Sequence, residues 1–265
     1  MLRIYQRLWQ VTWAEQWQYR ANLIMYLLYW LVSPVVYLAV WSAIAEAQGS
    51  VNGLTANDFA TYYLTLLIVD QLTSEITIHA FGYKVQDGSL SGELIRPAHP
   101  LLTNTLVYNL AFKALSLLGL VPVWAVLFAL FQPDYGTVTL ANLLLALLAI
   151  GLGFGISFLL GAALTCVAFW TTRVWALYEL YAGVTVLFSG QFVPLSLMPP
   201  AIQTAAQFLP FQMFKYVPVQ IILGRLTWPE VLGYYALGLA WLAAAWLLFR
   251  WVWSAGLKRY SAVGA

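Results

Sequence analysis

The chain has 265 residues, of which 62% are hydrophobic and 8% are charged. A soluble domain carries about 45–50% apolar and about 25% charged residues, so 12 Lys+Arg and 10 Asp+Glu are too few to solvate a globule of this size. The net charge of +2 and the single cysteine also exclude a nucleic-acid-binding protein, a disulfide framework and a cysteine-rich metal site, which leaves an integral membrane protein.

The N-terminal segment, residues 1–20, contains no long apolar run but has an aromatic face. Tyr5, Trp9, Trp13 and Trp17 recur every four residues, so they share one side of a helix, and arginines gather on the other side. This pattern predicts an amphipathic helix in the headgroup layer, with its arginines near the phosphates of membrane lipids. The alternative is that the aromatic stripe packs on neighbouring spans.

Long apolar runs predict six membrane-spanning helices, because a helix rising 1.5 Å per residue needs about 20 residues to cross a hydrocarbon core of roughly 30 Å. The second run is the least regular, since it continues through Asp70 and Glu75. Strands of a barrel are excluded because the runs show no polar alternation. The predicted spans are residues 21–45, 58–82, 105–131, 140–170, 174–193 and 231–253.

The basic residues predict the orientation of these spans. With an inward N-terminus, nine of them lie on the cytoplasmic side, and only Lys215 and Arg225 lie on the outer side. Lys113, near the inner start of the third span, can reach the inner interface. We therefore expect both termini in the cytoplasm, in agreement with an even number of spans.

The loop after the second span, residues 83–100, contains a short helix that Asp87 or Ser89 can cap and that Pro97 should end. The apolar residues of this helix have two interpretations. They are exposed and bind a partner protein, or they fold back onto the spans. These apolar residues are Leu90, Leu94 and Ile95.

The segment before the last span, residues 194–228, is rich in proline. Prolines at this density prevent one straight helix, and unpaired backbone cannot face lipid. We predict a re-entrant hairpin of broken helices in the outer leaflet, with Pro199 or Pro200 at a helix start. The alternative, a long outer loop, is less favoured because residues 208–223 are too apolar for water.

In the fourth span, small residues recur every four positions at Ala149, Gly153, Ser157 and Gly161. Small residues at this spacing let two helices approach closely. The pattern predicts packing against protein, either within the subunit or across a dimer.

Four charged residues fall within the predicted spans, and such residues are functional candidates by default. They are Asp70, Glu75, Lys113 and Glu179. Lys113 could pair with Glu75 or Glu179 and offset the cost of burying the acid. An ion-coupled carrier would instead use Asp70 and Glu75 as proton relays, although such carriers usually show internal repeats, which this sequence lacks.

We find no candidate catalytic or metal-binding residues. His79, His99 and Cys166 fall at different depths, so we expect no metal site. Residues 88–92 match the letters of a nucleophile elbow but lack its strand–turn–helix context. No lysine follows a glycine, so the chain has no phosphate-binding loop of the Gly-Lys-Ser/Thr type.

Taken together, these features resemble the permease subunits of ABC transporters in the type-2 exporter class. The string DGSLSGELIRP at 87–97 resembles the Gly-x-Leu-Ser…Leu-x-Arg-Pro stretch of one bacterial branch. The string FSGQFVPLSLMP at 188–199 resembles the Pro-Leu-x-x-Met-Pro signature common to the class. The signature residues here are Pro194, Leu195, Met198 and Pro199.

The resemblance implies a non-catalytic subunit that forms half of a translocation path in the bacterial plasma (inner) membrane. ATP and Mg would bind to separate cytoplasmic ATPase subunits, so this chain needs no cofactor, and a second permease, identical or related, would complete the path. Carbohydrates, lipids and drugs are all cargoes of the class. The short helix in the inner loop would be the coupling helix that contacts the ATPase. Its contact residues would be Asp87, Gly88, Ser89, Leu90, Ser91, Glu93, Leu94, Ile95 and Arg96.

Overall fold

The computed structural model describes residues 2–96, 99–101, 105–171 and 173–260, and its regular elements there are helices. This agrees with the predicted all-helical class. The elements are, in chain order, α1 (Leu2–Gln18), α2 (Arg20–Gln48), α3 (Ala56–Thr73), α4 (Thr77–Gln86), α5 (Leu90–Leu94), α6 (Leu106–Phe131), α7 (Leu140–Thr165), η2 (Cys166–Phe169), α8 (Val174–Phe188), η3 (Leu195–Leu197), α9 (Pro200–Phe208), η4 (Pro210–Met213), α10 (Tyr216–Ile222) and α11 (Trp228–Leu257).

Within the described residues, four helical segments are long and apolar enough to cross a membrane. They are Ile24–Gln48, Leu106–Phe131, Leu140–Phe169 and Trp228–Leu257. These segments coincide with the first, third, fourth and sixth predicted spans. α8 is also apolar but has only 15 residues. The chain is therefore a helical membrane protein.

The second predicted span, residues 58–82, is not one continuous helix. α3 ends at Thr73 and α4 begins at Thr77, and the backbone of Ser74 between them is extended (φ −63°, ψ 147°). The prediction of a single helix is wrong here because the polar residues of this span were assumed to continue the helix. A helix can end inside a membrane protein when neighbouring side chains bind the backbone groups that are set free.

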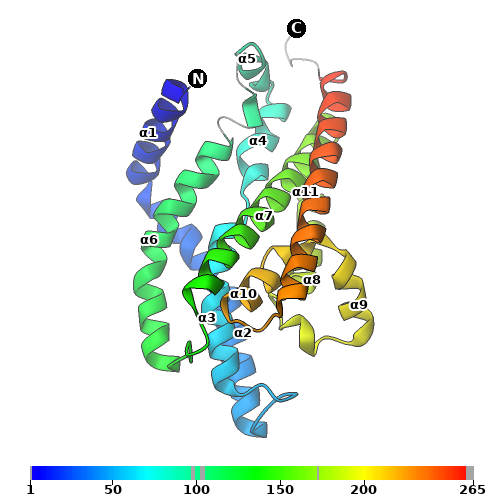
Figure 1. The fold of residues 1–265 in the computed structure, drawn as a ribbon. Helices are drawn as coiled ribbons and strands as arrows, with labels where there is room; N and C mark the ends of the chain where they lie inside the picture. Colours follow the sequence, from blue (N-terminus) through cyan, green and yellow to red (C-terminus); the bar gives the residue numbers. More distant parts are fainter. Residues whose placement is uncertain (1, 97–98, 102–104, 172, 261–265) are drawn as a thin grey trace.

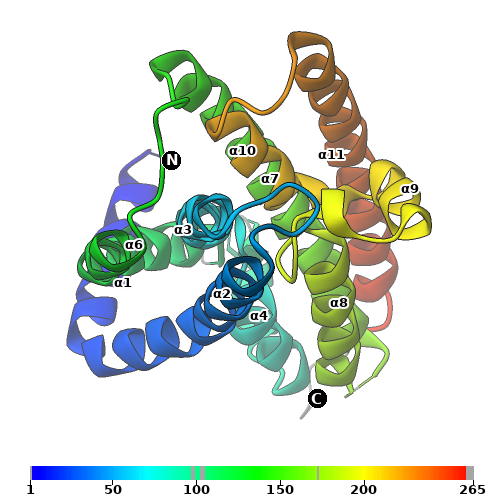
Figure 2. The ribbon, with the colours of Figure 1, turned by 90° about the horizontal axis from the view of Figure 1, so that it is seen from below.

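The start of the first described helix and the end of the last one lie at the same end of the bundle. Figure 1 shows the start of α1, α5 and the end of α11 together, and the connection between α2 and α3 at the opposite end. Seen along the bundle in Figure 2, α3 is central, and α2, α6, α7 and α10 pack around it. α11 packs along α7. This arrangement agrees with a chain that runs back and forth an even number of times.

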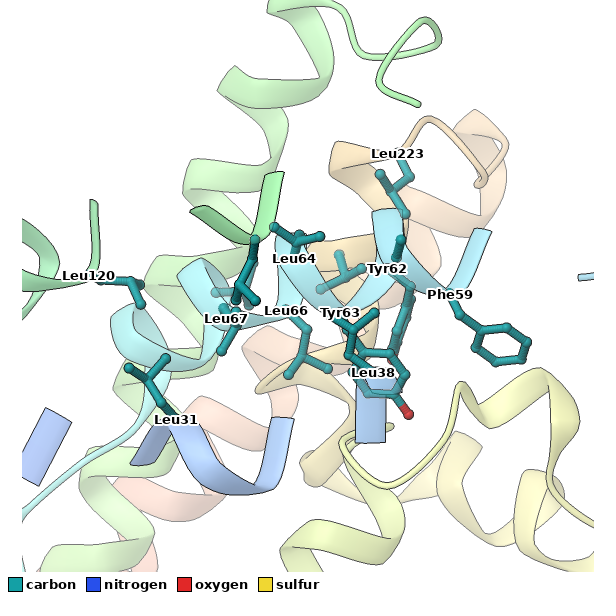
Figure 3. Packing of buried hydrophobic residues seen from close by; sticks show 14 of the residues in the cluster. Leu31, Leu38, Phe59, Tyr62, Tyr63, Leu64, Leu66, Leu67, Leu120 and Leu223 are labelled. Carbon is teal, nitrogen blue, oxygen red and sulfur yellow. The ribbon is translucent and has the colours of Figure 1, made fainter. Parts of the chain in front are cut away.

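Twelve of the 18 residues of α3 are buried, in agreement with its central position. Figure 3 shows side chains of one cluster along α3, with Leu223, directly after α10, near Tyr62 and with Leu120 of α6 near Leu67. Lipid tails are as apolar as leucine, so burial inside the protein gains close packing rather than escape from water. Small residues and polar contacts therefore decide how these helices fit together.

Prolines divide the segment after α8 into short helices. The predicted fifth span, residues 174–193, ends early at Phe188, and the chain turns at Gly190, whose φ of +81° favours glycine. α9 begins at Pro200, one of the two prolines predicted at a helix start, and η4 begins at Pro210. The prolines thus begin short helices instead of interrupting a long one.

α1 packs along α6, and its aromatic face is divided between protein and surface. Trp13 contacts the buried pair Phe112 and Leu115 of α6, whereas Trp17 is 59% exposed. The side chain of Tyr5 lies outside the described part of the chain. The stripe therefore packs on a neighbouring helix near Trp13, as the alternative predicted, while the position of α1 in the headgroup layer stays a prediction.

The four small residues of α7 are all buried, and two of them form close contacts within the chain. A Cβ atom on Gly153 would collide with the carbonyl oxygen of Met213 in η4. A Cβ atom on Gly161 would collide with the carboxylate of Glu75. These contacts place the close approach within the subunit, one of the two predicted settings.

We predict that Gly153→Ala destabilises the protein by about 1–3 kcal/mol, because the added methyl group meets backbone that cannot turn aside as a side chain can. Thermal unfolding of the purified protein in detergent measures this loss. Gly151→Ala is the matched control, since a Cβ atom there has nothing within 4 Å. Equal unfolding temperatures for the two variants would contradict the close contact with Met213.

Candidate functional site

Side chains of α6 bind the backbone at the break between α3 and α4. Lys113 donates hydrogen bonds to the carbonyl oxygens of Gln71 (3.2 Å) and Ser74, which lie at the end of α3. One turn earlier on α6, Asn109 Oδ1 accepts a hydrogen bond from the backbone N–H of Ile76 (3.0 Å). An unsatisfied backbone group in a bilayer costs several kcal/mol, so these bonds allow the helix to end here.

Lys113 was a predicted partner of Glu75 or Glu179. The hydrogen bonds that the structure gives its ammonium group go to the two backbone carbonyls, and the group also lies 4.8 Å from the centre of the Phe154 ring on α7. Carbonyl dipoles and an aromatic face both stabilise a desolvated cation. Lys113 therefore acts at the break itself, as a cap on the end of α3.

Asp70 forms a buried ion pair with Lys215, a partner that sequence reasoning did not find. The Lys215 ammonium lies 2.7 Å from Asp70 Oδ1, and the two side chains are 5% and 8% exposed. Lys215 also donates a hydrogen bond to Gln191 Oε1 (2.5 Å), and the Ser74 hydroxyl donates one to Asp70 (2.6 Å). Lys215 was counted among the basic residues of the outer side, but its ammonium group is buried, and Asp70 offsets the cost of burying its charge.

Glu75 lies in the break and is buried. Its carboxylate rests against Gly161 of α7, where any larger residue would displace it. The break thereby touches a third helix through one acidic side chain. Asp70, Glu75 and Lys113, three of the four predicted intramembrane charges, thus lie at or next to the break.

A cavity of about 830 Å³ opens beside the break, between α2, α8 and the segment that follows α8. Seven aromatic residues contribute to its wall, and polar groups from the break, α7, α8 and the hairpin contribute to the rest. Pockets of 300–1,000 Å³ are typical of small-molecule sites. The aromatic residues are Tyr26, Tyr29, Trp30, Trp175, Tyr178, Tyr181 and Phe214, and the polar ones include Thr73, Ser74, Glu75, Ser157, Glu179, Gln191 and Lys215.

The predicted helix of the inner loop is present as α5, but its two leucines are not exposed. Leu90 is fully buried, and Leu94 is half-buried against the same cluster at the ends of α4, α7 and α11. Ile95 alone of the three apolar residues points away from the protein, with 87% of its surface exposed. The interpretation that the leucines fold back onto the spans is therefore correct, and only Ile95 fits the alternative.

Local hydrogen bonds shape the start of α5. The backbone N–H of Ser89 donates to Asp87 Oδ1 (2.9 Å), and the Ser91 hydroxyl donates to the carbonyl oxygen of Gly88 (2.8 Å). The bonds from Ser89 lower the pKa of Asp87, so this carboxyl is ionised at neutral pH. Pro97, the predicted end of the helix, lies outside the described residues.

Two further contacts fasten α5 to the rest of the protein. Lys84 of α4 pairs with Glu93 of α5 at 2.6 Å. The Tyr260 hydroxyl, after α11, donates to the carbonyl oxygen of Gly88 (2.8 Å) and accepts from the N–H of Ser91 (3.1 Å). Tyr260 had no signal in the sequence, because 169 residues separate it from Ser91.

The signature residues of the hairpin serve packing. Leu195 and Met198 are buried in one cluster, while Pro194 and Pro199 precede η3 and α9. Rings of α2 and α3 hold the preceding turn. The Trp41 Nε1–H and the Tyr63 hydroxyl both donate to the carbonyl oxygen of Phe192, and the Tyr62 hydroxyl donates to that of Gly190.

Among the described residues, no group of three or more His, Cys, Asp and Glu side chains could hold a metal ion. Cys166 is buried at the end of α7. His99 lies against the rings of Trp253 and Phe249, and burial lowers the pKa of its imidazole. The side chain of His79 lies outside the described part of the chain.

A family model described as "ABC-2 family transporter protein" matches residues 31–264. The match includes the break, α5, the hairpin and most of the cavity lining. It leaves out α1 and the first part of α2, which contributes Asn22, Met25, Tyr26, Tyr29 and Trp30 to the cavity. No curated protein matches the chain.

We predict that Lys215→Ala costs about 3–5 kcal/mol, because it leaves the Asp70 carboxylate buried and unpaired. The matched control is Arg225→Ala, which removes an ion pair with Asp58 whose side chains are 31% and 34% exposed, and should cost at most about 1 kcal/mol. Unfolding of both variants in detergent measures the difference. Similar losses would contradict the buried environment of Lys215.

Tyr260→Phe removes two hydrogen bonds from α5 and keeps the ring. We predict faster hydrogen–deuterium exchange of residues 87–96, because each lost bond is worth about 0.5–1.5 kcal/mol. Tyr83→Phe, on the exposed surface of α4, should leave the exchange unchanged. Indistinguishable exchange in the two variants would show that Tyr260 does not fasten α5.

Proposed function

The chain belongs to the ABC-2 family of transporter proteins, and we propose that it is the permease subunit of an exporter driven by separate ATPase subunits. The observation that carries this proposal is the family match over residues 31–264. The chain is thus a membrane permease component of an ABC transporter. The absence of a Gly-Lys-Ser/Thr phosphate loop from the sequence supports a division of labour in which ATP and Mg bind to the partner.

We propose that α5 and the residues after it contact the ATPase. Ile95 and Arg96 are exposed at the end of the bundle that carries both termini. The leucines of α5 pack inside the protein, so they support this surface and do not contact the partner themselves. An exposed isoleucine on a loop that Lys84 and Tyr260 hold in place is a suitable anchor, because little loop motion has to be frozen on binding.

The cavity beside the break is our candidate for the part of the translocation path that this subunit supplies. Its volume suits a small organic molecule, and its aromatic wall with polar groups suits an amphipathic one. A second permease, identical or related, would supply the other half of the path. α8 and the helices after it are short, so we expect the second permease to contribute most on this side of the bundle.

The proposed orientation places both termini and α5 in the bacterial cytoplasm, with the hairpin towards the outside. The basic residues support it, and the burial of Lys215 strengthens the bias, since a paired lysine inside the protein does not face either aqueous side. Six crossings require that α3 and α4 together form the second crossing. They also require that α8 and the turn after it form the fifth.

An ion-coupled carrier that relays protons through Asp70 and Glu75 is the alternative function. The ion pair with Lys215 does not favour it, because the Asp70 carboxylate is already engaged by an ammonium group at 2.7 Å. A carrier of this kind would lose transport with the proton gradient and keep it after ATP depletion. A permease driven by an ATPase would show the opposite dependence.

We predict that Ile95→Asp weakens ATPase binding at least tenfold, about 1.4 kcal/mol, because the new carboxylate would be desolvated at the interface. The measurement is ATP hydrolysis by the copurifying ATPase with increasing amounts of permease. Ile95→Leu keeps the apolar surface and should behave as the wild type. Unchanged stimulation by the Ile95→Asp variant would contradict the assignment of this surface.

A further inference from the structure

Two acidic side chains line the cavity beside the break. Glu75 comes from the break and is buried, whereas Glu179 comes from α8 and is exposed in the single chain. None of the ion pairs in the described part of the chain includes Glu179. A charged side chain within a span faces the inside of a bundle or a water-filled cavity, because lipid does not solvate it. The position of Glu179 therefore requires water or a positive charge in the cavity.

The basic residues near the cavity already have partners. Lys215, the one basic residue among the described lining residues, lies 2.7 Å from Asp70 and also donates a hydrogen bond to Gln191. Lys113 caps the end of α3 and lines a separate, smaller cavity, and its charge offsets part of that of Glu75. Three acidic and two basic side chains therefore meet in this region, and the charge that is left over is negative.

Aromatic rings lie beside the two carboxylates of the lining. Tyr178 of α8 interacts electrostatically with Glu75, with Glu179 and with Tyr29 of α2. Trp175, one turn earlier on α8, packs on Tyr178 with 5.4 Å between the ring centres. The faces of tyrosine and tryptophan rings attract a cation within about 6 Å, most strongly where water is excluded. The cavity thus offers a positive group both carboxylates and ring faces.

A buried hydroxyl group adds a polar contact to the same wall. Tyr181 of α8 lines the cavity, and its hydroxyl oxygen is buried. None of the hydrogen bonds among the described residues uses this hydroxyl, although Ser157 of α7 lies near it. A buried hydroxyl without a partner is costly, so it points to an occupant that carries a polar group.

Neutral and anionic molecules suit this lining less well than cations do. A neutral carbohydrate brings no positive charge, so it would desolvate the Glu179 carboxylate without compensation. An anion would be repelled by Glu75 and Glu179, and it would meet a Lys215 that Asp70 already neutralises. A cation with an apolar or aromatic body is attracted by the carboxylates and packs on the rings.

We propose that the cavity binds organic cations with an aromatic or apolar body, and that Glu179 is the residue that selects their charge. The proposal rests on the proposed function and deepens it, since it names the class of molecule that the permease would carry. Glu179 selects by attraction at the wall of the cavity, and the rings of α2 and α8 hold the body of the molecule.

The first test measures binding to the isolated chain and needs no ATPase. The probes are tetraphenylphosphonium and tetraphenylborate, which have nearly the same shape and opposite charges. Equilibrium dialysis against the chain in phosphatidylcholine nanodiscs, with empty nanodiscs subtracted, gives both affinities. We expect saturable binding of the phosphonium at least tenfold tighter than that of the borate. Equal affinities, no saturable binding of the phosphonium, or its displacement by the neutral sugar maltotriose would overturn the proposal.

Substitutions of Glu179 test its role in the same assay. Glu179→Gln should weaken binding of tetraphenylphosphonium at least tenfold, and Glu179→Lys should reverse the preference in favour of tetraphenylborate. A merely structural role of Glu179 would not reverse the preference. Glu46→Gln is the matched control, because this acid of α2 is exposed and lies outside the lining, so both affinities should stay as in the wild type. Equal behaviour of Glu179→Gln and Glu46→Gln would show that Glu179 does not select the charge.

The second test adds the copurifying ATPase. Tetraphenylphosphonium should raise ATP hydrolysis by the complex at least twofold, and the Glu179→Gln variant should need at least tenfold more of it for the same effect. Equal stimulation by tetraphenylborate would overturn the charge selection. Failure of the wild-type chain to bind or stimulate any ATPase would instead overturn the proposed function, and binding to the isolated chain would still decide which charge the cavity accepts.

Discussion

A chain inside a bilayer has to bind its own backbone polar groups, and this constraint shapes the centre of the protein. At the break between α3 and α4 the requirement is met by Lys113 and Asn109, which act as water does at a helix end in a soluble protein. Both side chains come from α6, so the position of α6 decides where α3 ends. The place where α3 ends in turn determines the buried position of Glu75 and the polar part of the cavity wall.

Polar contacts fasten the irregular segments at both ends of the bundle, where apolar packing alone would not specify their positions. At the end with the termini, Tyr260 and the Lys84–Glu93 pair fix α5. At the hairpin, the Asp70–Lys215 pair and ring donors such as Tyr62 fix the turn after α8. The regular helices between these ends face lipid with apolar side chains, so the specific chemistry of the permease is concentrated in its irregular parts.

The long charge-free helices and the proline at the start of α9 could be predicted from the sequence, because span length and proline geometry are local properties. The break after Thr73 could not be predicted, because the side chains that permit it belong to α6. No pattern within the second span indicates that they lie nearby. The partnership of Asp70 with Lys215 was missed for a related reason. Lys215 was counted with the outer side from its position in the sequence, whereas its burial depends on an acid from a distant helix.

The pairing of Asp70 with Lys215 also constrains how the chain is assembled during its synthesis. Desolvation of a lysine that enters the bilayer alone costs a large free energy. The hairpin therefore reaches its buried position only when the carboxylate of Asp70 is already in place. Asp70 is made well before Lys215, and a chain that folds from its N-terminus has α3 in the membrane by then. The ion pair therefore makes the buried position of the hairpin conditional on the helix at the centre of the bundle.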